Sequence, residues 1–249
     1  MSLVKAHYLN LDKVSFVAKK NDDGSLIPNP KGGKAVYINY DSNLFYMQTP
    51  KMIMPYDLSC YDGDYKKYSI NLAFRDLDSN ARIRGFHENM TALQEMIVKE
   101  ANKESKSWFG KKHKSIDVTS ALCKDLLKKS IDKGTGEPDG KYPDTINLKL
   151  PVRDGKPQFK ITDFQDQPIE NPDLETIFTK ESKIQAIVRC GGIWIVGVNF
   201  GCTWSVDQIR VESQSPSEGN KISFIQDDSE AEEEEDEVED TSDEDSDSD

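Results

Sequence analysis

Residues 183–212 read KIQAIVRCGGIWIVGVNFGCTWSVDQIRVE and form the most apolar stretch of a chain that is otherwise polar. Apolar and polar residues alternate at both ends of this stretch, and residues 193–198 form a continuous apolar run between them. Both patterns are typical of β-strands. We expect three consecutive antiparallel strands, with turns at Gly191-Gly192 and at residues 199–202, because glycine adopts the positive φ angles of tight turns at no steric cost.

The last of these strands changes its alternation halfway. Trp204 and Val206 share one parity, and Ile209 and Val211 share the other. A β-bulge near Asp207-Gln208 would turn both pairs to the core face, because one extra residue reverses the side on which the following residues lie. The stretch therefore predicts a twisted, bulged meander, from which a small barrel can be built.

Shorter strand patterns occur along the rest of the chain. They fall at residues 14–18, at 34–54 with a turn at 41–43, and at 69–74, 146–152, 159–164 and 222–225. Apolar residues spaced three and four apart predict an amphipathic helix that begins within residues 78–89 and extends to Ala101, and a second helix at 117–131. A short helical turn is expected at 171–178. The body is thus predicted to be mainly β, with helices inserted between groups of strands.

Charge divides the chain into two parts. Residues 227–249 contain 16 Asp or Glu and no Lys or Arg, out of 45 acids and 32 bases in the whole chain. Residues 1–226 therefore hold 29 acids, a body of net charge about +3. The tail has too few apolar residues to offset its ordering entropy, so we expect it to be disordered. A mildly basic body with a polyanionic tail fits a polyanion-binding protein that carries its own competitor; a tail that only maintains solubility is the alternative.

Aromatic and basic residues occur together in three places. The hairpin at 34–54 has bulky side chains on both faces, tyrosines alternate with lysines near residue 66, and a lysine-rich segment follows the first helix. Aromatic rings stack on unpaired bases and nearby cations bind phosphates. In the second and third places the candidate nucleic-acid contacts are Lys66, Lys67, Arg75, Trp108, Phe109, Lys111, Lys112 and Lys114. Ordinary strand-edge residues and a solvated loop anchored by one buried tryptophan are the alternatives. Trp194 and Trp204 fit either the core or an open face, and the core is the ordinary place for such large rings.

The sequence favours binding over catalysis. Nucleophile elbows, HExxH, phosphate loops and dinucleotide fingerprints are missing from the body, so we expect neither an enzyme nor a cofactor. The four cysteines and three histidines lack zinc-ligand spacing. Isolated acids such as Asp62 and Asp76 leave a metal-dependent nuclease as a further alternative. We see no signal peptide or membrane span, and expect a reducing compartment.

Three segments carry a resemblance to a known family. YINY at 37–40, FYMQTPKM at 45–52 and WIVGVNFGCTW at 194–204, together with the acidic C-terminus, resemble OB-fold single-stranded-DNA-binding proteins of large nucleocytoplasmic DNA viruses. The layout is similar to that of the acidic-tailed replication proteins of T7-like phages. The resemblance implies a five-stranded barrel whose groove binds unpaired DNA, and a tail that contacts replication partners or occupies the empty groove. The matching residues are Tyr37, Tyr40, Phe45, Tyr46, Lys51, Trp194, Phe200 and Trp204.

The tail departs from that family, whose tails usually finish with an aromatic or hydrophobic residue, because this one ends in SDSD. We expect an OB-like barrel at residues 1–226 and a disordered acidic tail at 227–249. The expected function is non-sequence-specific binding of single-stranded DNA in replication, recombination or repair, in the cytoplasm or nucleus of an infected cell. RNA in place of DNA stays open. The alternative is an acidic-tailed chaperone of histones or other basic nucleoproteins.

Overall fold

A computed structural model describes residues 2–30, 32–63, 66–170 and 172–212. The acidic tail at 227–249 and the edge strand expected at 222–225 lie outside the described residues. The described residues form one compact unit. None of the described helices is long and apolar enough to cross a membrane.

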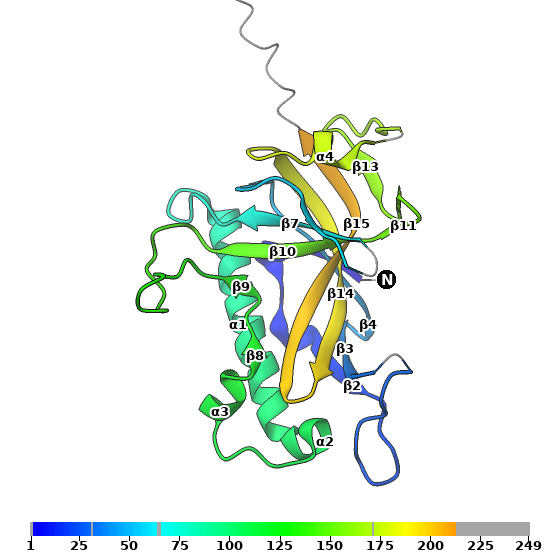
Figure 1. Ribbon diagram of the computed structural model, residues 1–249, viewed down its shortest axis with the longest axis vertical. Helices are drawn as coiled ribbons and strands as arrows, with labels where there is room; N and C mark the ends of the chain where they lie inside the picture. Colours follow the sequence, from blue (N-terminus) through cyan, green and yellow to red (C-terminus); the bar gives the residue numbers. More distant parts are fainter. Residues whose placement is uncertain (1, 31, 64–65, 171, 213–249) are drawn as a thin grey trace, which may run out of the picture. The chain divides into compact units, whose positions relative to one another are not determined.

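Two long antiparallel strands, β14 (Lys183–Val196) and β15 (Asn199–Glu212), form the axis of the fold (Figure 1). They are joined by a two-residue turn at Gly197-Val198, where Gly197 has a φ of 61°. The prediction of three strands is therefore wrong. Gly191-Gly192 forms a β-bulge within β14, since the register shifts between Cys190 and Ile193. Glycine pairs serve bulges as well as turns, because both need positive φ.

The second bulge lies where the sequence predicts it. Ile187 pairs with Gln208 and Val188 pairs with Val206, which leaves Asp207 as the extra residue of β15. The core-facing side chains before and after this bulge, at residues 204, 206, 209 and 211, are all at most 3% exposed. The bulge thus keeps both halves of the strand facing the core, as expected.

Strand pairing closes into a barrel. β14 pairs with β5 (Met52–Ile53), β5 with β7 (Lys67–Ala73), β7 with β10 (Thr145–Leu150), β10 with β15, and β15 with β14 again. These five strands form a closed ring. Within it, β10 and β15 run parallel, and Leu148 lies opposite Trp204. The fold is therefore mainly β, with an OB-like barrel and inserted helices, as the sequence predicts.

The N-terminal strands extend the sheet beyond the barrel. β3 (Lys34–Tyr40) and β4 (Asn43–Gln48) form the expected hairpin, with positive φ at Asp41 and Ser42 as a type I′ turn requires. β1 (Ser2–Lys5) runs parallel to β4, and β2 (Val14–Ala18) pairs with β3. The short elements are η1 (Ala6–Tyr8), η2 (Leu11–Lys13), β6 (Ser59–Tyr61), β8 (Cys123–Lys124), β9 (Leu127–Lys128), β11 (Val152–Arg153), β12 (Lys156–Pro157) and β13 (Lys160–Thr162).

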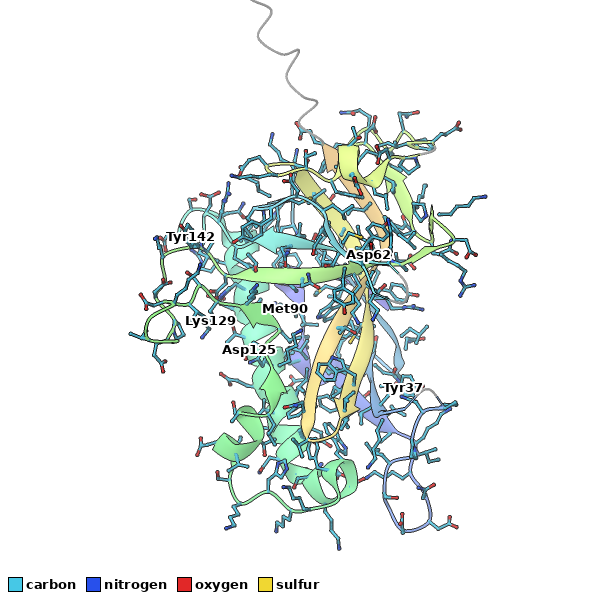
Figure 2. The ribbon with its side chains drawn as sticks, viewed as in Figure 1. Tyr37, Asp62, Met90, Asp125, Lys129 and Tyr142 are labelled. Carbon is cyan, nitrogen blue, oxygen red and sulfur yellow. The ribbon has the colours of Figure 1, made fainter. Side chains whose placement is uncertain are left out.

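One long helix, α1 (Ala81–Lys103), packs beside the sheet as expected (Figure 1). Asn80 caps its N-terminus by accepting hydrogen bonds from the backbone of Arg82 and Ile83. Its buried stripe includes Met90, which is labelled in Figure 2. Three short helices follow: α2 (Ser105–Phe109), α3 (Ile116–Ser120) and α4 (Leu174–Ile177).

The second long helix is absent from the described residues, so the prediction for 117–131 is wrong. Only α3 is helical there, and the chain then extends through β8 and β9. The Leu122 carbonyl accepts a hydrogen bond from the backbone of Phe200, and the backbone of Leu126 donates one to the Gln94 side chain. Pairing of β8 with β15 and of β9 with β10 overrides the helical spacing of the leucines.

We predict that Gly192→Ala destabilises the protein more than Gly197→Ala. Both residues have positive φ, so each substitution should lower the free energy of unfolding by about 1–2 kcal/mol through backbone strain. Only at Gly192 would the new Cβ also lie 2.6 Å from the Val36 carbonyl oxygen, whereas Gly197 has no atom within 4 Å. Urea unfolding of the two variants measures the difference. Equal losses would contradict a close approach of β14 to β3 at the bulge.

Candidate nucleic-acid interface

The outer wall of the barrel contains a hollow of about 780 Å³. We call it the barrel hollow. Side chains alternate along the strands that form it: Ile70 and Leu148 point into the core, whereas Asn71, Asn147 and Lys149 point outward and line the hollow. The remaining lining residues are Ser59, Lys124, Asp125, Leu126, Lys128, Lys129, Ile131, Pro138, Trp194, Cys202, Thr203 and Trp204.

A second hollow of about 730 Å³ adjoins the first and shares Asn71, Lys128, Lys129 and Ile131 with it. Residues 129–144, which connect β9 to β10, supply most of its lining. Figure 2 shows Lys129 and Tyr142 on the α1 side of β10. Tyr56 and Tyr142 line this hollow and are 58% and 59% exposed. The two hollows are continuous through the residues that they share, and aromatic side chains line each of them.

Trp194 is held over a glycine of the neighbouring strand. It pairs directly with Gly201 of β15, and a Cβ built on Gly201 would lie 2.9 Å from the Trp194 ring. The missing side chain therefore lets the indole lie against the strand. Because Trp194 is half-buried and lines the barrel hollow, one part of the ring is fixed and another is open. Such a ring is a platform on which a planar ligand can stack.

The two hollows together concentrate lysines that lack counter-ions. Among the described residues, none of the six lysines that line them forms an ion pair. They are Lys124, Lys128, Lys129, Lys133, Lys141 and Lys149. The acids nearby are used by the fold: Asp125 accepts from Gln94, Asp132 from the backbone of residues 134 and 135, and Asp139 from the backbone of Lys141. The surface therefore has a local positive excess, which favours an anionic ligand.

Lys149, which lines the barrel hollow, is affected by neighbouring cations. Desolvation in the hollow lowers the pKa of its ammonium group, and the positive charges of Lys124 and Lys67 lower it further. An ammonium group in this position gains from a bound anion in two ways, because the anion replaces lost solvation and offsets the repulsion among the lysines.

Six of the expected contact residues are corrected, because the structure buries their rings. Tyr40 stacks on Phe45 at 5.2 Å, and Phe45 meets Trp204 edge-on at the same distance. All six are at most 7% exposed, so none offers a ring face to a base: Tyr40, Phe45, Tyr46, Trp108, Phe200 and Trp204. All of them except Tyr46 belong to one hydrophobic core, to which the β3–β4 hairpin, α2 and β15 all contribute.

Two expected cations are engaged in ion pairs. Arg75 donates two hydrogen bonds of 2.8 Å to the Glu181 carboxylate, which lowers the pKa of that carboxyl. Lys51 lies 2.6 Å from the Glu212 carboxylate. Both pairs link residues distant in sequence, and neither Arg75 nor Lys51 lines the two hollows, so neither cation belongs to the candidate interface.

The other expected residues fall in separate places. Tyr37 is 45% exposed on β3 and lies across the β14–β15 hairpin from Lys129 and Tyr142 in the view of Figure 2. Phe109 is half-buried and stacks on His113 at 4.8 Å, beneath the exposed loop that carries Lys111, Lys112 and Lys114. Lys66 and Lys67 are exposed beside β6, and Lys67 lies 5.8 Å from the centre of the Tyr61 ring. Of the expected rings, Trp194 and Trp204 line the barrel hollow, but Trp204 is only 1% exposed whereas Trp194 is half-buried.

Several lining residues escape the sequence analysis. Lys124 and Lys128 fall in the segment assigned to a helix, which hides their position on a strand edge. Asn71, Asn147 and Lys149 have a usable signal: in INLA at 70–73 and TINLKL at 145–150, polar residues alternate with apolar ones and so face outward. Asp62 and Asp76 join no cluster of three or more metal-ligating side chains within the described part of the chain.

Neither the comparison with models of protein families nor that with curated proteins found a match. Among solved structures, the chain is similar to gp2.5, a single-stranded DNA binding protein encoded by bacteriophage T7, with 11% identity, 68% of this chain and 87% of that chain covered, and a TM-score of 0.40. The single-stranded DNA-binding protein from bacteriophage Enc34 shows 13% identity, coverage of 83% and 95%, and a TM-score of 0.43. The same protein in complex with ssDNA shows 13% identity, with 75% of this chain and 94% of that chain covered, and a TM-score of 0.41. These neighbours are phage proteins; an origin in a large nucleocytoplasmic DNA virus stays a prediction.

We predict that Lys149→Gln stabilises the ligand-free protein at neutral pH. Because the folded-state pKa of Lys149 is lowered, its charged form disfavours folding below that pKa. The gain should be largest at neutral pH and low salt, and decline as the pH rises through the lowered pKa toward the usual value of about 10.4. Urea unfolding midpoints measure it, with Lys156→Gln, at an exposed site outside the hollows, as the control. A lower midpoint for Lys149→Gln than for the control would contradict the view that the charge of Lys149 destabilises the ligand-free protein.

Proposed function

We propose that the protein binds single-stranded DNA, without sequence specificity, along the barrel hollow and its neighbour. The observation that carries this proposal is the open Trp194 ring among lysines that form no ion pair in the described residues. Lysines contact phosphates irrespective of sequence, and one ring stacks on any base. A duplex keeps its bases stacked on each other, so only an unpaired strand uses both features.

We further propose a role in DNA replication, recombination or repair, at viral replication sites in the cytoplasm or nucleus of an infected cell. DNA is favoured over RNA by the sequence resemblance, since stacking does not read the 2′-hydroxyl. The acidic tail at 227–249 either competes for the lysines of the hollows or recruits replication proteins. The 16 acids of the tail support competition for the lysines, and the sequence resemblance supports recruitment of replication proteins.

We predict that oligo-dT quenches the fluorescence of Trp194 alone among the three tryptophans. Trp108 and Trp204 are each 1% exposed, so neither ring can stack on a base. In Trp194→Leu the quenching should disappear and the Kd for oligo-dT should rise about five- to 150-fold, the range that loss of one stacked base implies. Trp108→Phe serves as the control and should keep both signals. Full quenching in Trp194→Leu would place the bound strand elsewhere.

We predict that deletion of residues 227–249 tightens oligo-dT binding at low salt. The difference between the full chain and residues 1–226 should shrink as salt rises, because salt screens the attraction between tail and hollow. A peptide of residues 227–249 added to the truncated protein should restore the weaker binding. Equal affinities at every salt concentration would exclude competition by the tail. Binding of histones but not of oligo-dT would favour the chaperone alternative over the proposed function.

A further inference from the structure

Two asparagines face each other across the floor of the barrel hollow. Asn71 lies within β7 and pairs directly with Asn147 in β10, and both line the hollow. Asparagine is depleted in strands, because its side chain competes with the backbone for hydrogen bonds. Two adjoining strands nevertheless carry it at one register position, on the outward face only, while their inward neighbours are isoleucine and leucine.

The contact between the two amides leaves hydrogen-bonding capacity unused. Asn147 Nδ2 lies 3.2 Å from Asn71 Oδ1 and 3.4 Å from the Ile70 carbonyl oxygen. A carboxamide has one oxygen acceptor and two N–H donors, so one contact between two amides always leaves one oxygen and one amino group over. Here these groups are Asn147 Oδ1 and Asn71 Nδ2, which have no partner among the described residues. The pair therefore offers the hollow one acceptor and one donor.

The asparagine pair lies beside the Trp194 platform. Leu148 pairs with Trp204, so Asn147 and Thr203 precede that pair on neighbouring strands, and both line the hollow. Gly201, which the Trp194 ring covers, is two residues before Thr203 and so faces the same side. A base stacked on the indole thus lies next to the asparagines.

We infer that Asn71 and Asn147 contact the Watson–Crick edge of an unpaired base and so make the hollow selective for single strands without making it selective for sequence. Each of the four bases carries a donor next to an acceptor on that edge, and an acceptor with a donor complements all four. In a duplex the same atoms are paired and hidden. This inference rests on the proposed function. It gives the amides a different role from the lysines, because lysines contact the phosphates of paired and unpaired strands alike.

The test compares three probes of one length: oligo-dT, an oligonucleotide that contains N3-methylthymine in place of thymine, and an abasic strand. The methyl group blocks the Watson–Crick edge but keeps the phosphates and a ring for stacking. The double variant N71A/N147A is compared with wild type and with Asn39→Ala, which removes an asparagine from β3 outside the hollow.

Wild type and Asn39→Ala should bind oligo-dT more tightly than the methylated strand. In N71A/N147A the Kd for oligo-dT should rise about five- to 150-fold, the usual range for loss of a base-edge contact. The variant should no longer distinguish oligo-dT from the methylated strand, and its affinity for the abasic strand should equal that of wild type, which also shows that it is folded. Oligo-dC and oligo-dA should lose affinity to a similar extent.

Wild-type affinity of N71A/N147A for oligo-dT would overturn the inference and leave the proposed function intact. If N71A/N147A lost affinity for oligo-dT but not for oligo-dC or oligo-dA, the pair would recognise one base only. That result would overturn the inferred lack of sequence selectivity. If wild type binds none of the three probes, the proposed function fails and this inference fails with it.

Discussion

The antiparallel pairing of β14 with β15 is the interaction on which the rest of the structure depends. Its two outer edges pair with six other strands, among them β5 and β10, which close the barrel through β7. Along β14 the partners are β5, β4 and β3 in turn, and along β15 they are β13, β10 and β8. Strands of 14 residues are long enough to serve two layers only if they bend. The bulges at Asp207 and at Gly191-Gly192 supply this bend, because an extra residue increases the local twist of a strand.

The same hairpin builds the candidate interface. Gly201 leaves the space over β15 that the Trp194 ring occupies, and the edge of β15 positions Lys124 and Lys149 through β8 and β10. Charge is distributed unevenly over the body. Arg75, Lys51 and Arg210 are paired with acids and link distant parts of the barrel, whereas the lysines of the hollows have no ion pairs in the described residues. The lowered pKa of Lys149 indicates that cations held together for a ligand reduce the stability of the ligand-free protein.

Local pattern was sufficient to predict much of this fold. The alternation in residues 34–48 and 203–211 predicted the strands, and the change of parity at Asp207 predicted the bulge, because both depend on neighbours in sequence. Two elements were mispredicted because local patterns are ambiguous. A glycine pair suits either a turn or a bulge, and the leucine spacing at 117–131 suits a helix until the free edges of β10 and β15 bind the same segment as β8 and β9.

The candidate site was harder to predict because barrel closure decides which face of each strand is open. Aromatic residues indicate the interface in the sequence, yet the hydrophobic core between the β3–β4 hairpin and the barrel buries Tyr40, Phe45 and Trp204, because large rings bury most surface. The residues that remain on the outer face are the polar ones of each strand in which polar and apolar residues alternate. In a small closed barrel, polar residues that are unfavourable in strands are therefore the more informative signal. Asn71 and Asn147 meet that criterion, since neither a helix cap nor a turn explains an asparagine in the middle of β7 or β10.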